Sequence, residues 1–220
     1  SLLKVQPDNA ATLYALGILA TQTDDAPGAE TYFTRFVDVL GRNPNDERDP
    51  SRALLILSQL AEERGDLAGA LLWLNKVPDN TDEQTRFNAQ LRRAHLTNKG
   101  GDLTAARALL AEVKPTEPAR QAQLMAADAQ LLRQANQLPE AYAVMEAAAQ
   151  RFPKNPDLLY DFALLAEKMG KVDVMEAQLR EVMAQAPDNH HAYNALGYSL
   201  AERNVRLQEA YGLIAKALEM

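Results

Sequence analysis

Apolar residues recur along the chain three and four positions apart, and short polar or glycine-containing stretches interrupt them at regular intervals. The stretch nearest the N-terminus contains two such sets, separated by a polar segment. The first set is Leu13, Leu16, Gly17 and Ala20, and the second is Ala29, Phe33 and Phe36. Residues spaced in this way line one face of a helix. The pattern therefore predicts successive pairs of amphipathic helices.

The paired pattern repeats with a period close to 34 residues. Pro153 and Pro187, which lie 34 residues apart, bound the clearest unit. The small residue of the second helix aligns at Ala29, Ala70, Ala106, Ala141 and Ala210, and Met175 replaces it in the fifth unit. The residue four positions further on is apolar in every unit, at Phe33, Leu74, Leu110, Met145, Leu179 and Ile214. A fixed period of this length predicts stacked repeats that share one continuous core.

These units resemble the tetratricopeptide repeat, a 34-residue helix–turn–helix with the pattern W-x2-L-G-x2-Y, A-x3-F, P. The single tryptophan, Trp73, departs from that pattern because it lies on a second helix. The resemblance covers essentially the whole chain. It implies an all-α fold, a right-handed α-solenoid superhelix of about six antiparallel helix–turn–helix repeats. We expect a single array over residues 1–220, with approximate units 7–44, 45–81, 82–117, 118–153, 154–187 and 188–220.

Local signals support helix pairs independently of the resemblance. Asp49–Pro50 and Asn155–Pro156 each place a capping side chain before a proline at the first helical position. Thr81 with Gln84 three residues later predicts a capping box. Three glycines predict tight turns inside the pairs: Gly65, Gly101 and Gly170.

The two ends of the chain look like interior parts of an array. Leu2–Pro7 resembles the end of a preceding second helix, and the sequence stops at Met220 without a polar capping helix. Because terminal repeats normally carry a polar outer face, we expect a fragment of a longer array. The alternative is a natural chain whose ends are covered by self-association.

Composition and charge narrow the classes of function. The chain has no cysteine, which excludes a disulfide scaffold, a thiol nucleophile and a thiolate metal site. The net charge of −7 is spread evenly over both halves, with no basic patch for nucleic acid. No stretch approaches the roughly 18 uncharged apolar residues of a membrane helix. We therefore expect neither nucleic-acid binding nor membrane insertion by this segment.

Candidate catalytic chemistry is sparse. The adjacent His190 and His191 lack the spacing of three or four residues that helical metal ligands need. The carboxylate pairs Asp24–Asp25 and Glu62–Glu63 are also adjacent, so their side chains do not face each other on a helix. No phosphate loop, dinucleotide fingerprint, nucleophile elbow or HExxH motif occurs. We expect no enzymatic activity, no catalytic residues, no metal and no cofactor.

What remains is a surface. In tetratricopeptide arrays the first helices line a concave face that binds peptides or helices of partner proteins. The resemblance assigns two groove positions to each first helix, one and five residues after its apolar anchor. They are Tyr14, Ile18, Leu55, Gln59, Leu91, His95, Ala126, Gln130, Tyr160, Leu164, Asn194 and Tyr198. Such aromatic, aliphatic and amide side chains suit an extended peptide, and the alternative is that they pack on the next repeat.

We therefore expect a scaffold that binds an extended peptide or a helix of a partner protein in its concave groove. One subfamily binds an acidic C-terminal carboxylate through Lys and Asn; only Asn194 fits that arrangement, which disfavours it. Two alternatives stay open: a structural spacer or self-association module acting through the repeat ends, and a sensory or regulatory module of a larger protein. The segment 193–203 is similar to one common in tetratricopeptide proteins of Gram-negative bacteria, which favours a bacterial source and a periplasmic or outer-membrane location over the cytoplasm.

Overall fold

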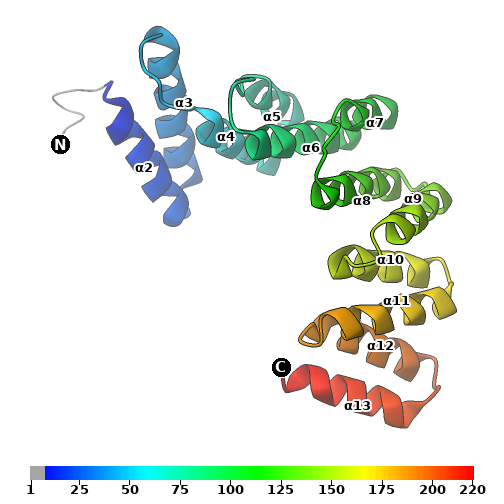
Figure 1. Cartoon of the computed structure of the whole chain (residues 1–220). Helices are drawn as coiled ribbons and strands as arrows, with labels where there is room; N and C mark the ends of the chain where they lie inside the picture. Colours follow the sequence, from blue (N-terminus) through cyan, green and yellow to red (C-terminus); the bar gives the residue numbers. More distant parts are fainter. Residues whose placement is uncertain (1–7) are drawn as a thin grey trace. The chain divides into compact units, whose positions relative to one another are not determined.

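A computed structural model describes residues 8–220, and its elements, drawn in Figure 1, are twelve helices in this range and no strand. The helices are α2 (Ala10–Gln22), α3 (Ala26–Arg42), α4 (Ser51–Glu63), α5 (Leu67–Leu74), α6 (Glu83–Lys99), α7 (Leu103–Ala111), α8 (Pro118–Gln134), α9 (Leu138–Arg151), α10 (Pro156–Lys168), α11 (Val172–Gln185), α12 (His190–Glu202) and α13 (Leu207–Leu218). Consecutive helices pack as pairs, which confirms the all-α repeat solenoid. The helix end predicted at Leu2–Pro7 lies outside the described residues.

The helix pairs form two compact units. Helices α2 to α7 belong to the N-terminal unit, which ends at Val113, and α8 to α13 belong to the C-terminal unit, which begins at Lys114. Inside each unit the second helix of one pair packs on the first helix of the next, as α3 does on α4 and α11 on α12. Each unit is therefore a stack of three pairs with its own apolar interior.

Small residues let the two helices of a pair approach closely. A Cβ at Gly17 would lie 2.6 Å from the Phe33 ring, and one at Gly197 would lie 2.7 Å from Ile214 Cγ1. The equivalent position is buried and small in every first helix: Gly17, Ser58, Ala94, Ala129, Ala163 and Gly197. The six residues aligned on the second helices, from Ala29 to Ala210, are likewise buried. These two sets of buried residues determine which positions of the two helices in a pair lie opposite each other.

The turn inside each pair places one residue in the left-handed backbone region. Glycine fills this position in three pairs, at Gly65, Gly101 and Gly170, as the sequence predicted. The other three pairs use a short polar residue with φ between 55° and 59°: Asp24, Asn136 and Asn204. Asn and Asp tolerate this region because their side chains hydrogen-bond locally. All six turns therefore have a common conformation with two different residue chemistries.

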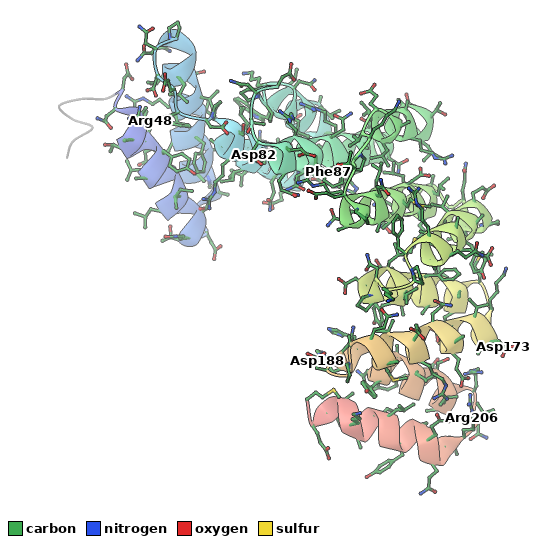
Figure 2. The ribbon with its side chains drawn as sticks, viewed as in Figure 1. Arg48, Asp82, Phe87, Asp173, Asp188 and Arg206 are labelled. Atoms are coloured by element: carbon green, nitrogen blue, oxygen red, sulfur yellow. The ribbon has the colours of Figure 1, made fainter. Side chains whose placement is uncertain are left out.

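The predicted helix starts are partly wrong. Asn155 caps α10 as expected, accepting a 3.1 Å hydrogen bond from the Leu158 amide. The Thr81–Gln84 capping box is absent, because Asp82, labelled in Figure 2 at the start of α6, caps that helix instead. Thr81 is buried, and its hydroxyl donates to Asp49 at 2.8 Å.

Asp49 also differs from its predicted role. Helix α4 begins at Ser51, so Pro50 is the residue before the helix and not its first residue. The Asp49 carboxylate accepts the Ser51 amide at 2.8 Å as well as the Thr81 hydroxyl. Burial alone would raise the pKa of Asp49, but these hydrogen bonds outweigh it and lower the pKa. Asp49 thus ties the start of α4 to the segment that precedes α6.

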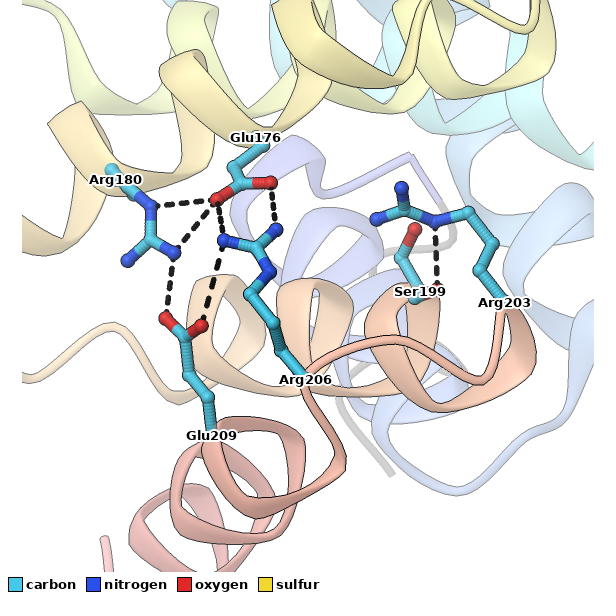
Figure 3. A network of polar contacts seen from close by, with 6 residues as sticks. All are labelled: Glu176, Arg180, Ser199, Arg203, Arg206 and Glu209. Carbon is cyan, nitrogen blue, oxygen red and sulfur yellow. Dashed lines mark hydrogen bonds and ion pairs between the residues drawn. The ribbon is translucent and has the colours of Figure 1, made fainter.

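An ion-pair network joins α11 to the start of α13 in the C-terminal unit (Figure 3). Glu176 accepts hydrogen bonds from Arg206 and, at 2.7 Å, from Arg180. Arg180 also donates to Glu209 at 2.6 Å. The hydrogen bond from Arg206 is the main cause that lowers the pKa of Glu176 to about 2. The network holds Arg206, whose φ is 48°, at the left-handed position just before α13.

Candidate functional site

Two clefts open along the first helices of the N-terminal unit. The first cleft, about 510 Å³, lies between the first two pairs. Its lining is Ile18, Thr21, Gln22, Asp24, Ala26, Ala29, Arg52, Ile56, Gln59, Leu60 and Glu63. Two of the predicted groove residues, Ile18 on α2 and Gln59 on α4, therefore line one cleft.

The second cleft, about 460 Å³, lies between α4 and α6. Its lining is Arg52, Leu55, Ile56, Gln59, Asn88, Leu91 and Arg92. The predicted groove residues Leu55, Gln59 and Leu91 meet here. Because Arg52, Ile56 and Gln59 line both clefts, the two form one continuous surface along α2, α4 and α6, which we call the N-terminal groove.

The helical register explains which residues face this groove. Leu54 is buried, and the groove residues of α4 lie two before it and one, two and five after it: Arg52, Leu55, Ile56 and Gln59. Around Gln90, the equivalent position on α6, the same offsets give Asn88, Leu91 and Arg92. Sequence reasoning used only the offsets of one and five. It missed Arg52, Ile56, Asn88 and Arg92, although residues four apart on a helix share a face.

Basic residues converge on one carboxylate beside the groove. Glu62, on α4, is 2.8 Å from Arg92 and 2.9 Å from Lys99 on α6. His95, predicted as a groove residue, lies 3.5 Å from the same carboxylate through its Nε2 atom. Burial would raise the pKa of Glu62, but the Lys99 hydrogen bond and the nearby positive charges lower it. His95 thus lies next to an ion-pair cluster between α4 and α6 and does not line either cleft.

Tyr14 contributes to packing inside the first pair. Its ring centroid is 5.9 Å from that of Phe33 and 5.2 Å from that of Phe36, distances typical of aromatic pairs. The ring is partly buried and does not line either cleft of this unit.

The remaining predicted groove residues lie in the C-terminal unit. Gln130 and Ala126 line a cleft of about 340 Å³ together with Arg133 and Asp161. Loss of solvent around the carboxyl raises the pKa of Asp161. Sequence reasoning missed Asp161, which lies two residues after the apolar anchor Leu159.

Aromatic residues mark the first helices α10 and α12. The Tyr160 ring lies 6.3 Å from His191, whose ring is 3.9 Å from that of His190. Burial raises the pKa of Tyr160. Tyr198 is 56% exposed, whereas Leu164 and Asn194 are partly buried. This unit thus brings Ala126 and Gln130 to one cleft and leaves Tyr198 exposed on α12.

The described part of the chain offers binding surface and little reactive chemistry. Within residues 8–220 no three His, Asp or Glu side chains are grouped so that they could hold a metal ion. None of the helices described in this range is both long and apolar enough to cross a bilayer.

Comparison with known proteins gives a consistent result. The tetratricopeptide repeat family model matches residues 132–197. A TPR repeat-containing protein of Pseudomonas aeruginosa is 37% identical over 161 residues, which are 73% of this chain. The aligned part is only 27% of that relative, so the chain spans about a quarter of the length of the curated relative that it matches.

Two solved structures share the fold. MamA 41-end from Desulfovibrio magneticus RS-1 aligns with a TM-score of 0.53 and 16% identity, covering 79% of this chain and 96% of that chain. The MamA RS-1 ArsTM double mutant has the same TM-score and coverage at 17% identity.

The stacked helix pairs define an all-α repeat protein of the solenoid class. The family match over residues 132–197 and the relative from Pseudomonas aeruginosa take this further: both support a tetratricopeptide repeat protein of the bacterial type. The tetratricopeptide fold is a general scaffold for protein–protein interaction, and its members act by binding protein or peptide partners and not by catalysis.

Proposed function

We propose that this chain binds an extended peptide segment of a partner protein in the N-terminal groove. The observation that carries the proposal is the continuity of the two clefts, which share Arg52, Ile56 and Gln59 along α4. A surface that runs across successive first helices suits an extended chain, which can place side chains in both clefts.

The lining of the groove supports a peptide ligand. Ile18, Leu55, Ile56 and Leu91 supply apolar contact, while Gln59 supplies an amide at the point that both clefts share. About half of the lining is polar or charged, and a site that places polar groups beside apolar surface can combine affinity with orientation. An extended peptide exposes both its side chains and its backbone amides, so it can use both kinds of contact.

Selection of binding peptides from a random display library, with the purified chain as bait, provides the test. The affinity of each enriched peptide is then measured for the wild type and for Leu91→Glu, which puts a charge into the apolar part of the groove. We expect Leu91→Glu to weaken binding at least about tenfold, since about 1.4 kcal/mol of lost contact has that effect.

Leu72→Glu is the matched control, because Leu72 belongs to the same unit, lies on the second helix α5 and is 65% exposed. It should leave affinity unchanged. Peptides that bind Leu91→Glu as tightly as the wild type but lose affinity for a Tyr160→Ala, Tyr198→Ala double variant would move the site to the C-terminal unit and contradict the proposal.

A second candidate function, self-association, is favoured by the outer face of α13. Leu207, Tyr211 and Leu218 are 54%, 77% and 82% exposed and lie on one side of this helix. The second helix of the preceding pair, α11, covers its outer face with α12. Sedimentation across a concentration series, with a Tyr211→Lys, Leu218→Lys double variant as comparison, decides the point. A wild type that stays monomeric throughout would exclude this candidate.

A further inference from the structure

The two clefts of the N-terminal groove differ in charge. The first cleft is lined by two carboxylates, Asp24 and Glu63, and by Arg52. The second cleft is lined by Arg52 and Arg92 and by no carboxylate. The chain as a whole carries a formal charge of −7. The lining of the second cleft, with two arginines and no acidic residue, therefore has a charge opposite in sign to that of the whole chain.

Arg52 has no polar partner among the residues that the structure describes. Its guanidinium makes no ion pair or hydrogen bond with any of residues 8–220, and the side chain is exposed. It lies in the first turn of α4, where the helix dipole disfavours a cation, and this turn contains no acidic residue. A positive charge that has no polar partner among the described residues is available to bind a ligand.

The rest of the second cleft complements this cation. The Asn88 side-chain oxygen accepts a 2.9 Å hydrogen bond from Gln84, which leaves its amide nitrogen free to donate to a ligand. Arg92 is held in place by its 2.8 Å contact with Glu62. Leu55, Ile56 and Leu91 form an apolar surface between these polar groups. The cleft therefore presents hydrogen-bond donors and positive charge beside a patch for an aliphatic side chain.

We propose that the second cleft binds the carboxylate of an acidic residue in the partner peptide, with an aliphatic residue next to it on the Leu55–Leu91 surface. The inference rests on the proposed function, because it assigns a ligand class to the same groove. Arg52 and the Asn88 amide donate to the carboxylate, and charge-assisted hydrogen bonds of this kind are the stronger ones in proteins.

The carboxylate belongs to a side chain inside the peptide and not to its C-terminus. The groove continues from the second cleft into the first through three shared residues, so a bound chain runs past Arg52 and does not end there.

The test uses capped peptides and residue-resolved nuclear magnetic resonance titration of the whole chain, because weak binding is then still visible. The probe is acetyl-Ser-Gly-Leu-Glu-Leu-Gly-Ser-amide, and two matched peptides carry Gln or Lys in place of Glu. A fourth peptide carries Gln and a free C-terminal carboxylate. We expect the Glu peptide to shift the amide signals of α4 and α6 with at least about tenfold higher affinity than the Gln and Lys peptides.

Variants of the chain assign the effect to Arg52. Arg52→Gln should remove the preference for Glu over Gln, and Arg52→Glu should turn it into a preference for Lys. Arg42→Gln is the matched control, since Arg42 is an exposed arginine of the same unit, in the last turn of α3. This variant should keep the wild-type preference. The Arg52 changes should leave the fold intact, because Arg52 has no partner among the described residues.

The outcomes separate this inference from the proposed function. If display-selected peptides bind the groove but the Glu and Gln probes bind equally, the proposed function is supported and the proposed acidic ligand is wrong. If only the peptide with a free C-terminus shifts α4 and α6, the source of the carboxylate is wrong. If neither the probes nor any selected peptide binds the groove, both the proposed function and the proposed acidic ligand are wrong.

Discussion

The N-terminal and C-terminal units repeat the same helix pair but secure its second helix by different means. In the N-terminal unit an aspartate caps each second helix, as Asp25, Asp66 and Asp102 accept the amides of Gly28, Gly69 and Ala105. In the C-terminal unit no side chain caps α9, α11 or α13. There the Glu176 network fixes the approach to α13 instead.

The groove differs between the units in the same way. The first helices of the N-terminal unit share a continuous groove, whereas those of the C-terminal unit carry a smaller cleft and the exposed Tyr198. The comparison teaches that the buried register is common to all six pairs, while the caps, the ion pairs and the groove surface are set locally. Function in such an array follows from the surface positions and not from the shared interior.

The largest effect is expected from emptying the interior of one unit. Phe33 and Leu179 occupy equivalent, fully buried positions in the two units. Phe33→Ala should destabilise the N-terminal unit by about 3–5 kcal/mol, and Leu179→Ala the C-terminal unit by about 2–5 kcal/mol. Hydrogen exchange should show lost protection concentrated in the unit that carries the change. Equal loss over both units would mean that they unfold as one.

A smaller effect, confined to the C-terminal unit, concerns Glu176. Its pKa is about 2 in the folded chain against an ordinary 4.5, so its contribution is complete above pH 4.5 and is lost as the pH falls towards 2. Because its arginine partners are nearly half exposed, we expect Glu176→Gln to cost about 1–2 kcal/mol at pH 7. Denaturant unfolding of both proteins from pH 7 to pH 3 should show the difference narrowing. A gap independent of pH would exclude the ionised network as its cause.

The role of the helix caps can be tested by removing a cap from the N-terminal unit and adding one to the C-terminal unit. Asp66→Ala should destabilise the N-terminal unit by about 1 kcal/mol, because the Gly69 amide loses its acceptor. Gln137→Asp, at the uncapped start of α9, should stabilise the C-terminal unit by up to about 1 kcal/mol. Thermal unfolding followed by circular dichroism measures both. The same sign for the two changes would show that the cap is not what distinguishes the units.

Groove residues should have the smallest effect on stability. Arg52→Gln removes no contact within residues 8–220, so we expect a change within about 0.5 kcal/mol in the free energy of unfolding, as for most surface substitutions. Denaturant titration of this variant beside the wild type checks it. A loss well above that range would mean that Arg52 supports the fold, and its assignment to a ligand would lose its basis.

Much of the fold could be predicted from the sequence because the buried register repeats. The small residue at the position of Ala29 recurs in five of the six helix pairs and the apolar residue at the position of Phe33 in all six, and this recurrence is visible without a structure. Helix starts were harder, because a capping side chain competes with tertiary contacts: Thr81 bonds to Asp49, 32 residues away, and Asp82 takes its place as the cap.

The site was predicted less completely. Leu55, Gln59 and Leu91, which line the second cleft, were predicted as groove residues because they lie one or five positions after the aligned residues Leu54 and Gln90. Arg52 and Arg92 were missed because only two offsets on the helix face were considered. That Arg52 is unpaired while Arg92 is held by Glu62 depends on neighbouring helices, which no local pattern reveals.

The most direct test of the central claim, that the N-terminal groove is the peptide-binding surface, is a crosslinking map. A display-selected peptide carrying a photoreactive residue is irradiated with the chain, and mass spectrometry locates the attachment sites. We predict attachment on α2, α4 and α6, at exposed groove residues such as Gln22, Gln59 and Asn88. Attachment concentrated on α3, α5 and α7, or in the C-terminal unit, would contradict the claim.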